Sequence, residues 1–266
     1  MGQSTSDVWG SGDAYERYVG RWSRLIAREF LNWLAVPARA HWLDVGCGTG
    51  ALTETVLAIA SPAKVLGVDP AEPYVAFARA HVRDPRASFE VGSAMALPAQ
   101  AATYDTTVTG LVLNFVPRAD TALTEMTRVT RSGGGVVAAY VWDYAEGMGL
   151  MRRFWDAAVA LDPSKAPLDE GRRFPLCRPE PLAQLFKAAG LNDVKASGIT
   201  IPTIFRDFDD YWSPFLGGQG PAGGYAMSLT EEGRATLRER IRASLPIEPD
   251  GSIHLTARAW AVRGTH

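Results

Sequence analysis

In the first half of the chain, apolar residues recur in two patterns, one typical of strands and one typical of helices. Five short apolar runs are typical of buried strands, and they lie at residues 41–45, 64–69, 88–91, 104–110 and 136–142. Between these runs, apolar residues recur at helical spacing: Leu52, Val56 and Ile59, then Val75 and Ala78 within 73–81, then Leu123, Met126 and Val129. This alternation predicts a parallel sheet that is covered by helices on both faces.

A helical pattern also precedes the first strand. Ser23 is its predicted N-cap, and Pro37 ends it. The residues spaced for one helical face are Leu25, Ile26, Phe30, Trp33 and Leu34. We therefore expect residues 1–36 to form an N-terminal helical cap.

The second half of the chain is less regular. Helices are predicted at 150–161, with Met151, Phe154, Trp155 and Ala158 on one face, and from Pro181 to Gly190, and strands at 194–205 and 253–262. The stretch 217–224, GGQGPAGG, is predicted to be a flexible loop. Ser228 and Glu231 match a capping box, which predicts a helix that carries Leu237, Ile241 and Leu245.

Composition narrows the class of protein. The chain has 266 residues, 47% of them hydrophobic, and a formal net charge of -2, which gives no global attraction for nucleic acid. Cys47 and Cys177 lack metal-ligand spacing, so we expect reduced thiols, no metal site and a cytoplasmic location. No apolar stretch is long enough to span a membrane. The start, Met-Gly with Ser6, leaves myristoylation as a less favoured alternative to a disordered N-terminus.

The segment 42–50, WLDVGCGTG, ends a predicted buried strand on an acid and then turns on glycines. Such a turn places backbone N–H groups and a helix N-terminus against a ligand. The glycine spacing differs from the dinucleotide fingerprint, and Asp44 would repel a pyrophosphate but favour a cationic group. Asp69 ends the second strand, where an acid can bind both hydroxyls of a ribose. The turn therefore favours a cationic nucleoside without phosphate.

These segments together resemble one family. WLDVGCGTG, VLGVDP (65–70) and GSAMALP (92–98) are similar, in this order, to the first three cofactor-binding motifs of class I S-adenosylmethionine-dependent methyltransferases, in particular the small-molecule, type 11-like members. TYDTTVTGLVLNFVP (103–117) resembles their fourth-strand motif, and TRVTRSGGGVVAAYVW (127–142) the helix, loop and strand that follow. The resemblance implies an α/β, Rossmann-like fold: a seven-stranded, mostly parallel sheet with helices on both faces, an antiparallel last strand near the edge, and helical cap or lid insertions.

The resemblance also implies S-adenosyl-L-methionine as cofactor, S-adenosyl-L-homocysteine as product, and a set of binding residues. Asp44, Gly46, Cys47 and Gly48 would line the methionine half of the cofactor, Asp69 and Pro70 the ribose, Ser93, Ala94 and Met95 the adenine, and Leu111, Asn114 and Phe115 the transferring methyl. Tyr18 would close over the cofactor, and Arg21 would meet the cofactor's carboxylate. Ser93 departs from the acid that many relatives carry there; its hydroxyl can still accept a hydrogen bond.

Substrate residues are expected in the aromatic segments outside the shared sheet, and we assign Tyr15, Trp142, Tyr144, Phe154 and Trp212 to a substrate pocket. No catalytic residue is assigned, because a base is needed only if the nucleophile carries a proton when it reacts. We expect His41, His81, His254 and His266 to be structural or exposed. The loop at 217–224 is a candidate hinge for a lid.

The sequence thus predicts methyl transfer to a small, largely apolar molecule, at oxygen, nitrogen or carbon, by positioning and desolvation. Two alternatives stay open: an NAD-linked oxidoreductase on a similar sheet, and a non-catalytic cofactor-binding or partner protein. The expected partner is the small-molecule substrate, with no nucleic acid, membrane or metal, and the oligomeric state is not predicted. We expect one methyltransferase domain over 1–266, with the cofactor-binding core at 37–142, substrate-side segments at 143–192 and 206–250, and terminal strands at 193–205 and 251–264.

Overall fold

The computed structural model describes residues 20–218 and 220–266, and these residues form two compact units. The core unit comprises Trp22–Trp142, Pro175–Ile199 and Ala259–His266. The insertion unit comprises, among the described residues, 20–21, Asp143–Phe174 and Thr200–Arg258. These bounds differ from the predicted substrate-side segments, because residues 175–199 belong to the core unit; the single-domain layout stays a prediction.

Seven strands form one sheet in the order β3-β2-β1-β4-β5-β7-β6. Their bounds are β1 His41–Val45, β2 Lys64–Asp69, β3 Ala87–Val91, β4 Thr106–Gly110, β5 Val136–Trp142, β6 Asn192–Phe205 and β7 Ile253–Thr265. The first five strands pair in parallel, whereas β7 runs antiparallel to β5, from Val136 opposite Thr265 to Trp142 opposite Ala259. The predicted Rossmann-like sheet and its antiparallel last strand near the edge are therefore confirmed.

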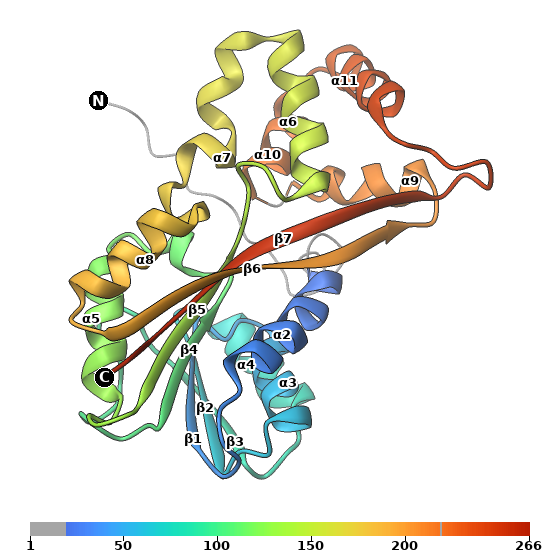
Figure 1. The fold of residues 1–266 in the computed structure, drawn as a ribbon. Coiled ribbons are helices and arrows are strands. Elements are labelled where there is room, and N and C mark those ends of the chain that lie inside the picture. The colour runs from blue at the N-terminus through green and yellow to red at the C-terminus, as the bar shows by residue number, and fades with distance from the viewer. Residues whose placement is uncertain (1–19, 219) are drawn as a thin grey trace. The chain divides into compact units, whose positions relative to one another are not determined.

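Helices cover both faces of the sheet within the core unit (Figure 1). They are α2 Arg21–Leu34, α3 Ala51–Ile59, α4 Glu72–His81, α5 Ala119–Val129 and α8 Pro179–Ala188, with short 3-10 turns η2 Leu113–Phe115 and η4 Pro175–Cys177. On one face, Val137 and Ala139 of β5 pack with Leu123 of α5. On the other face, Tyr140 packs against Phe30 of α2, with ring centroids 4.6 Å apart. Side chains alternate between faces along a strand, so this division fixes where each strand residue points.

Several predicted elements agree with the structure to the residue. The bounds of β1, β2 and β5 are as predicted, and Val75 and Ala78 of α4 are buried. Strand β4 begins later than predicted, because Tyr104 forms only an isolated bridge with Thr130. Buried apolar runs bounded by Pro and Gly are the pattern that sequence defines best.

The insertion unit is mostly helical. Its elements are α6 Gly149–Leu161, η3 Pro163–Leu168, α7 Glu170–Arg173, α9 Phe208–Trp212, η5 Ser213–Gly217, α10 Gly220–Ser228 and α11 Glu231–Ser244, with the ends of β6 and β7. Phe154 of α6 stacks on Phe215 with centroids 4.5 Å apart, and Trp155 stacks on Tyr225 at 5.7 Å. These rings form the unit's own core.

The start of α2 corrects one prediction. Ser23 is not an N-cap, because the helix already begins at Arg21 and Ser23 is buried inside it. Leu25 is 44% exposed, while Ala27 and Leu31 take the buried positions. The helix begins earlier than predicted, but the spacing of its buried residues is unchanged. Trp22, which the predicted cap placed outside the helix, takes the place on the buried face that Leu25 was expected to take.

The glycine-rich stretch 217–224 is not a flexible loop over its whole length, because helix α10 begins at Gly220. A Cβ added at Gly223 would lie 3.0 Å from the backbone carbon of Gly218 and 3.2 Å from the Phe215 carbonyl oxygen. The glycine at 223 therefore permits the close packing of α10 on η5. Tertiary packing overrides the low helix propensity of glycine here.

The predicted capping box at Ser228 and Glu231 is also wrong. Ser228 ends α10 and its hydroxyl donates to the Tyr225 carbonyl oxygen, whereas Thr230 caps α11 by accepting from the Gly233 N–H at 3.2 Å. The helix itself is as predicted, with Leu237 and Ile241 buried; Leu245 is also buried but lies just after the helix, as its C-cap. Thr230 therefore caps the unpaired N–H groups at the start of α11, two residues later in the chain than the predicted cap.

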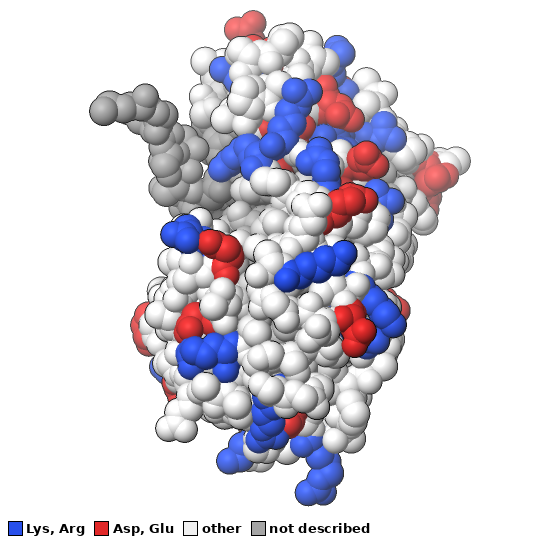
Figure 2. Space-filling view, turned by 60° about the vertical axis from the view of Figure 1, so that its left-hand side comes forward, with Lys and Arg blue, Asp and Glu red and all other residues white. Residues whose placement is uncertain are grey.

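The distribution of charge on the surface matches the near-neutral composition. Basic and acidic side chains are interspersed on the face shown in Figure 2. No helix within the described ranges is long and apolar enough to cross a membrane.

Candidate functional site

The turn after β1 is held by the neighbouring strand. The backbone N–H groups of Gly46 and Cys47 both donate to the Val68 carbonyl oxygen of β2, at 2.7 and 3.1 Å. Gly46, Gly48 and Gly50 have positive φ angles of 75°, 52° and 94°, which side chains disfavour. The three glycines therefore let the chain reverse between β1 and α3. A Cβ at Gly46 would meet the Val112 side chain at 2.6 Å, whereas the space beside Gly48 is open.

Asp44 lies at the mouth of this turn and is 1% exposed. Its Oδ2 accepts a hydrogen bond of 2.7 Å from the Thr53 hydroxyl of α3. Burial raises the pKa of Asp44 to about 7, and the charge of Asp69 adds to the rise. A buried carboxylate without a cationic partner is costly, so the position favours a positively charged ligand.

Asp69 ends β2 beside the turn. One carboxylate oxygen accepts from the Gly48 N–H at 3.0 Å and the other from the Ala71 N–H at 2.9 Å. Burial raises the pKa of Asp69 above its ordinary value, and both backbone hydrogen bonds oppose the rise. The carboxylate is thus fixed in position with lone pairs left for a second set of donors.

Cys47 contributes backbone rather than a side chain. Its thiol side is buried against Val75, Ala78 and Phe89 in a small apolar cluster, and burial raises its pKa. Both cysteines of the chain are buried, and neither forms a disulfide bond. The raised pKa of the Cys47 thiol is the opposite of the lowered pKa that a reactive cysteine needs.

Tyr74 was missed by the sequence analysis. Its hydroxyl, on α4, is buried and has no hydrogen-bond partner among the described residues. Burial raises the pKa of Tyr74, and the charge of Asp69 raises it further. A tyrosine one turn into a helix looks like packing in the sequence; only the proximity of Asp69 makes its hydroxyl a candidate binding group.

The predicted adenine residues follow β3. Ser93 Oγ accepts from the Met95 N–H at 3.1 Å, so the hydroxyl forms a local turn and keeps its own proton to donate. Ala94 packs against the main core, Met95 is half-buried and Pro70 is exposed. Ser93 is therefore placed by its own turn rather than by a partner from another strand.

The predicted methyl-side residues follow β4. Leu111 has a φ of 65°, rare for a side chain of its size, and its N–H donates to the Tyr140 carbonyl oxygen at 2.7 Å. Asn114 lies in η2, and its Oδ1 is buried with no donor among the described residues. Phe115 is half-buried in the same turn. Strained backbone and an unsatisfied acceptor are features that cluster at binding sites.

The remaining predicted residues lie elsewhere. Tyr15 and Tyr18 are outside the described residues. Arg21 is in the insertion unit, where its guanidinium binds Asp210 at 2.8 Å and stacks over the Phe205 ring at 4.7 Å. A role for Arg21 toward the cofactor carboxylate stays a prediction.

The predicted substrate-pocket residues divide between the units. Tyr144, Phe154 and Trp212 belong to the insertion unit and are buried, with Tyr144 against Phe174 and Trp212 against Phe215. Trp142 ends β5 in the core unit and is 2% exposed. The packing of the three insertion-unit rings accounts for their burial without a ligand.

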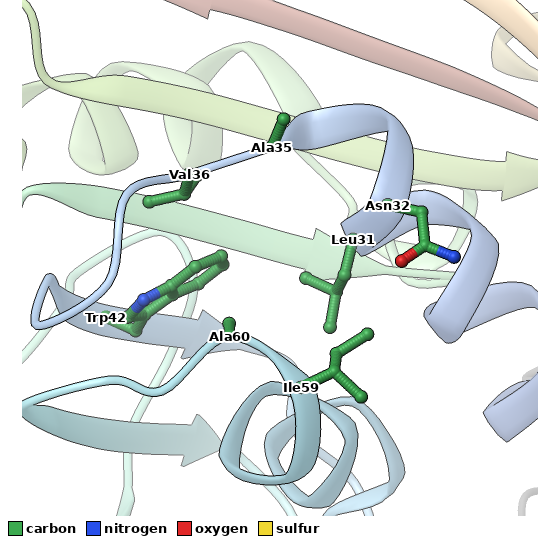
Figure 3. Close-up of a pocket in the computed structure, with 7 residues that line it drawn as sticks. All are labelled: Leu31, Asn32, Ala35, Val36, Trp42, Ile59 and Ala60. Carbon is green, nitrogen blue, oxygen red and sulfur yellow. The ribbon is translucent and has the colours of Figure 1, made fainter.

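A small cavity in the core unit lies away from the acid–glycine turn (Figure 3). It has a volume of about 220 Å³ and is lined by Leu31, Asn32, Ala35, Val36, Trp42, Ile59 and Ala60. Trp42 lies near the amino end of β1, whereas the turn follows its carboxyl end. Ligands of open α/β sheets bind at the carboxyl ends of the strands, so we place the site at the turn and not in this cavity.

The site fits a cationic sulfur nucleoside better than a phosphate. Two buried acids, Asp44 and Asp69, flank the glycine turn, and the Tyr74 hydroxyl and Asn114 Oδ1 are buried polar groups without a hydrogen-bond partner among the described residues. A pyrophosphate would bring more negative charge beside Asp44. Among the described residues, no three His, Cys, Asp or Glu side chains gather to hold a metal ion.

Known proteins agree with this geometry. Residues 43–134 match a family model described as a methyltransferase domain. The chain is 33% identical over 175 residues to a demethylmenaquinone methyltransferase of Roseiflexus sp. (strain RS-1), which covers 60% of this chain and 71% of that protein. It is 35% identical over 101 residues to a malonyl-[acyl-carrier protein] O-methyltransferase of Methylococcus capsulatus (strain ATCC 33009 / NCIMB 11132 / Bath), covering 37% and 36%.

Solved structures share the fold. The YcgJ protein of Bacillus subtilis superposes with a TM-score of 0.58 at 16% identity, covering 91% of this chain and 99% of that one. A Haemonchus contortus phosphoethanolamine N-methyltransferase, solved with S-adenosylhomocysteine, gives 0.57 at 15% identity, covering 96% and 57%. With the buried acids, the glycine turn and the sequence relatives taken together, the chain belongs to the class I S-adenosylmethionine-dependent methyltransferases, and its cofactor is S-adenosylmethionine.

Proposed function

We propose that the chain transfers the methyl group of S-adenosylmethionine to a small, largely apolar acceptor and releases S-adenosylhomocysteine. The observation that carries the proposal is the pair of buried acids at the ends of two adjacent parallel strands, Asp44 on β1 and Asp69 on β2. They flank a glycine turn whose backbone approaches the ligand directly.

The residues of the core unit have separable tasks in this proposal. Asp69, fixed by the Gly48 and Ala71 N–H groups, accepts from the ribose hydroxyls. Asp44 lies beside the cationic end of the cofactor, where its carboxylate gains the positive partner that the free protein lacks. When bound, the cofactor supplies an electrophilic methyl on a sulfonium. The protein orients that methyl and excludes water, which is the main demand of such an alkylation.

The Asn114 side chain faces the end of the cofactor that carries the methyl in this proposal. Its buried Oδ1 can accept a weak hydrogen bond from a polarised C–H group or a normal one from an acceptor hydroxyl. Leu111, held in a left-handed conformation by its hydrogen bond to the Tyr140 carbonyl oxygen, fixes where η2 begins. Both residues position groups and neither supplies a base.

For the acceptor we propose an aromatic ring of the quinol type. The support is the demethylmenaquinone methyltransferase of Roseiflexus, of which the matched region covers 71%. The carrier-protein methyltransferase is covered over 36% only, so it gives weaker support for an acceptor. We place the reaction in the cytoplasm, where thiols such as those of Cys47 and Cys177 stay reduced.

The test is mass spectrometry of a small-molecule extract incubated with the protein and deuterium-labelled S-adenosylmethionine. A labelled product that requires the wild-type chain, and that is lost with Asp69→Ala, is the expected result. Thermal shift assays supply a second readout, with stabilisation by S-adenosylhomocysteine and none by NADH. Stabilisation by NADH alone, or no labelled product from extracts that contain quinols, would overturn the proposal.

A further inference from the structure

Trp142 carries an unsatisfied buried hydrogen-bond donor at the carboxyl end of the sheet. Its side chain is 2% exposed, and no acceptor lies within hydrogen-bond distance of Nε1 in the described part of the chain. Buried polar groups are nearly always paired, and an unpaired one is costly. A donor of this kind, at the edge where open sheets bind ligands, is available to bond an oxygen atom of a bound molecule.

The register of the sheet shows which face Trp142 occupies. Asp44 of β1 is the partner of Val108 on β4, and Val108 is the partner of Ala138 on β5. Partners in a parallel register lie on one face, and every second residue of a strand returns to that face. Tyr140 and Trp142 therefore point to the same face of the sheet as Asp44.

The strand geometry also gives the separation between Trp142 and the acid. Strands β1 and β5 are two positions apart in the sheet, so the lateral distance is about 10 Å. Trp142 lies four residues beyond the level of Asp44, which adds about 13 Å along the strand direction. Strand β4 between them ends at Gly110, opposite Tyr140, so Trp142 extends past its end.

We propose that the Trp142 indole N–H donates a hydrogen bond to an oxygen atom on the acceptor ring, so that the core unit selects an oxygen-bearing aromatic acceptor over a bare hydrocarbon. This inference rests on the proposed function, because it places the acceptor next to the cofactor seat. The acceptor would lie beyond Asp44 along the strand direction, at the level where Trp142 extends past the end of β4. A site built to bond an oxygen rejects the analogue that lacks it, since the buried donor is then left unpaired.

The chain offers a matched control. Trp42 of β1 is 1% exposed, and its Nε1 also lacks an acceptor among the described residues. It points to the same face of the sheet but lies near the amino end of its strand, beside the cavity of Figure 3. Trp42→Phe and Trp142→Phe therefore remove the same donor from equally buried sites, and only the second removes it where the acceptor is proposed to bind.

The experiment measures binding of 1,4-naphthoquinone and of naphthalene by calorimetry, with the protein saturated by S-adenosylhomocysteine. For the wild type we expect naphthoquinone to bind more tightly than naphthalene. Trp142→Phe should weaken naphthoquinone about fivefold to tenfold, the effect of one lost hydrogen bond, and leave naphthalene within about twofold. Trp42→Phe should change neither ligand, and the affinity for S-adenosylhomocysteine should be unchanged in both variants.

Three outcomes would overturn the inference: equal affinity of the wild type for the two ligands, an unchanged naphthoquinone affinity in Trp142→Phe, or an equal loss for both ligands. The last would mark Trp142 as packing alone. Failure of the proposed function is read separately, as the absence of labelled product from the wild-type protein, and does not depend on these affinities. Trp142→Phe should also raise the KM for an oxygen-bearing acceptor while the KM for the cofactor stays constant.

Discussion

Asp44 provides the sharpest test of the acid–glycine turn, because its burial costs stability in the cofactor-free protein. Replacing it with asparagine keeps the shape of the side chain and an oxygen that can accept from Thr53, but removes the charge. We expect Asp44→Asn to be more stable than the wild type at neutral pH and to bind S-adenosylhomocysteine at least tenfold more weakly. The Asp44 carboxylate would then both destabilise the cofactor-free protein and bind the cofactor.

The magnitude follows from the pKa shift. Burial raises the pKa of Asp44 from 3.8 to about 7, and each unit corresponds to about 1.4 kcal/mol. The folded state thus holds a proton that the unfolded state releases, so wild-type stability falls as the pH rises from about 4 to about 7. The full cost, about 4 kcal/mol, applies above pH 7 and vanishes below pH 4.

The assay is urea unfolding of the cofactor-free variants, followed by circular dichroism at pH 5, 6, 7 and 8. The relevant quantity is the free energy of unfolding of Asp44→Asn minus that of the wild type. Burial also raises the pKa of Glu170 to about 7, and this contribution cancels in the difference. Asp84→Asn is the control, since the hydrogen bond from Arg86 lowers the pKa of Asp84 to about 2, outside the tested range.

Between pH 5 and pH 7 the stability difference should grow by about 2 kcal/mol in favour of asparagine. The Asp84→Asn difference should stay flat. A flat difference for Asp44→Asn, or an asparagine variant that is less stable than the wild type at pH 8, would refute the reasoning that burial raises the pKa of this carboxyl.

Three other predictions concern single side chains. Gly46→Ala should cost about 3 kcal/mol of unfolding free energy, because its Cβ would meet a valine side chain at 2.6 Å. Gly48→Ala should cost only about 1 kcal/mol, because the space beside Gly48 is open, and urea unfolding of the two variants measures the difference. Arg258→Met should cost about 2–3 kcal/mol by leaving Asp143, 2% exposed and bound at 2.6 Å, without its cation, and the double variant with Asp143→Asn should recover part of this. Asp69→Ala should weaken S-adenosylhomocysteine at least tenfold by calorimetry with unchanged far-ultraviolet dichroism; unchanged affinity would exclude the ribose assignment.

The sheet could be predicted closely from the sequence because its strands are buried and sharply bounded. Strand β1 ends at an acid and a glycine turn, and β2 ends at Asp69 before Pro70. The order of motifs also implied the antiparallel β7, which local pattern alone does not reveal. Parallel strands buried on both faces give the clearest apolar runs in any sequence.

The errors lie where tertiary contacts overrule local preference. Gly220 to Gly224 reads as a loop, yet the chain is helical there because the small residues allow α10 to pack closely on η5. The cap of α11 is Thr230 and not Ser228, since two hydroxyl residues that are two positions apart compete for one role and the sequence cannot decide between them. Boundaries of this kind depend on packing from distant segments.

The site was predicted in part. Asp44, Asp69 and the glycines follow from a motif with fixed spacing, and the structure brings them together at one edge of the sheet. Tyr74 could not be found, because a tyrosine on a short amphipathic helix has no signal that separates packing from binding. Its relation to Asp69 depends on how α4 lies against β2, which only the folded chain determines.

Because β7 pairs with β5, one edge of β5 stays unpaired until the end of the chain has been synthesised. Strand β5 pairs with β4 early, but its other edge is filled by Ala259–Thr265, which the ribosome delivers more than a hundred residues later. At typical translation rates this edge, with the apolar sequence Val-Val-Ala-Ala-Tyr-Val, stays open for roughly ten seconds. Unpaired apolar edges recruit strands from other molecules. Nascent chains and fragments that lack β7 are therefore natural clients for chaperones, and C-terminal truncation should convert this enzyme into an aggregating polypeptide.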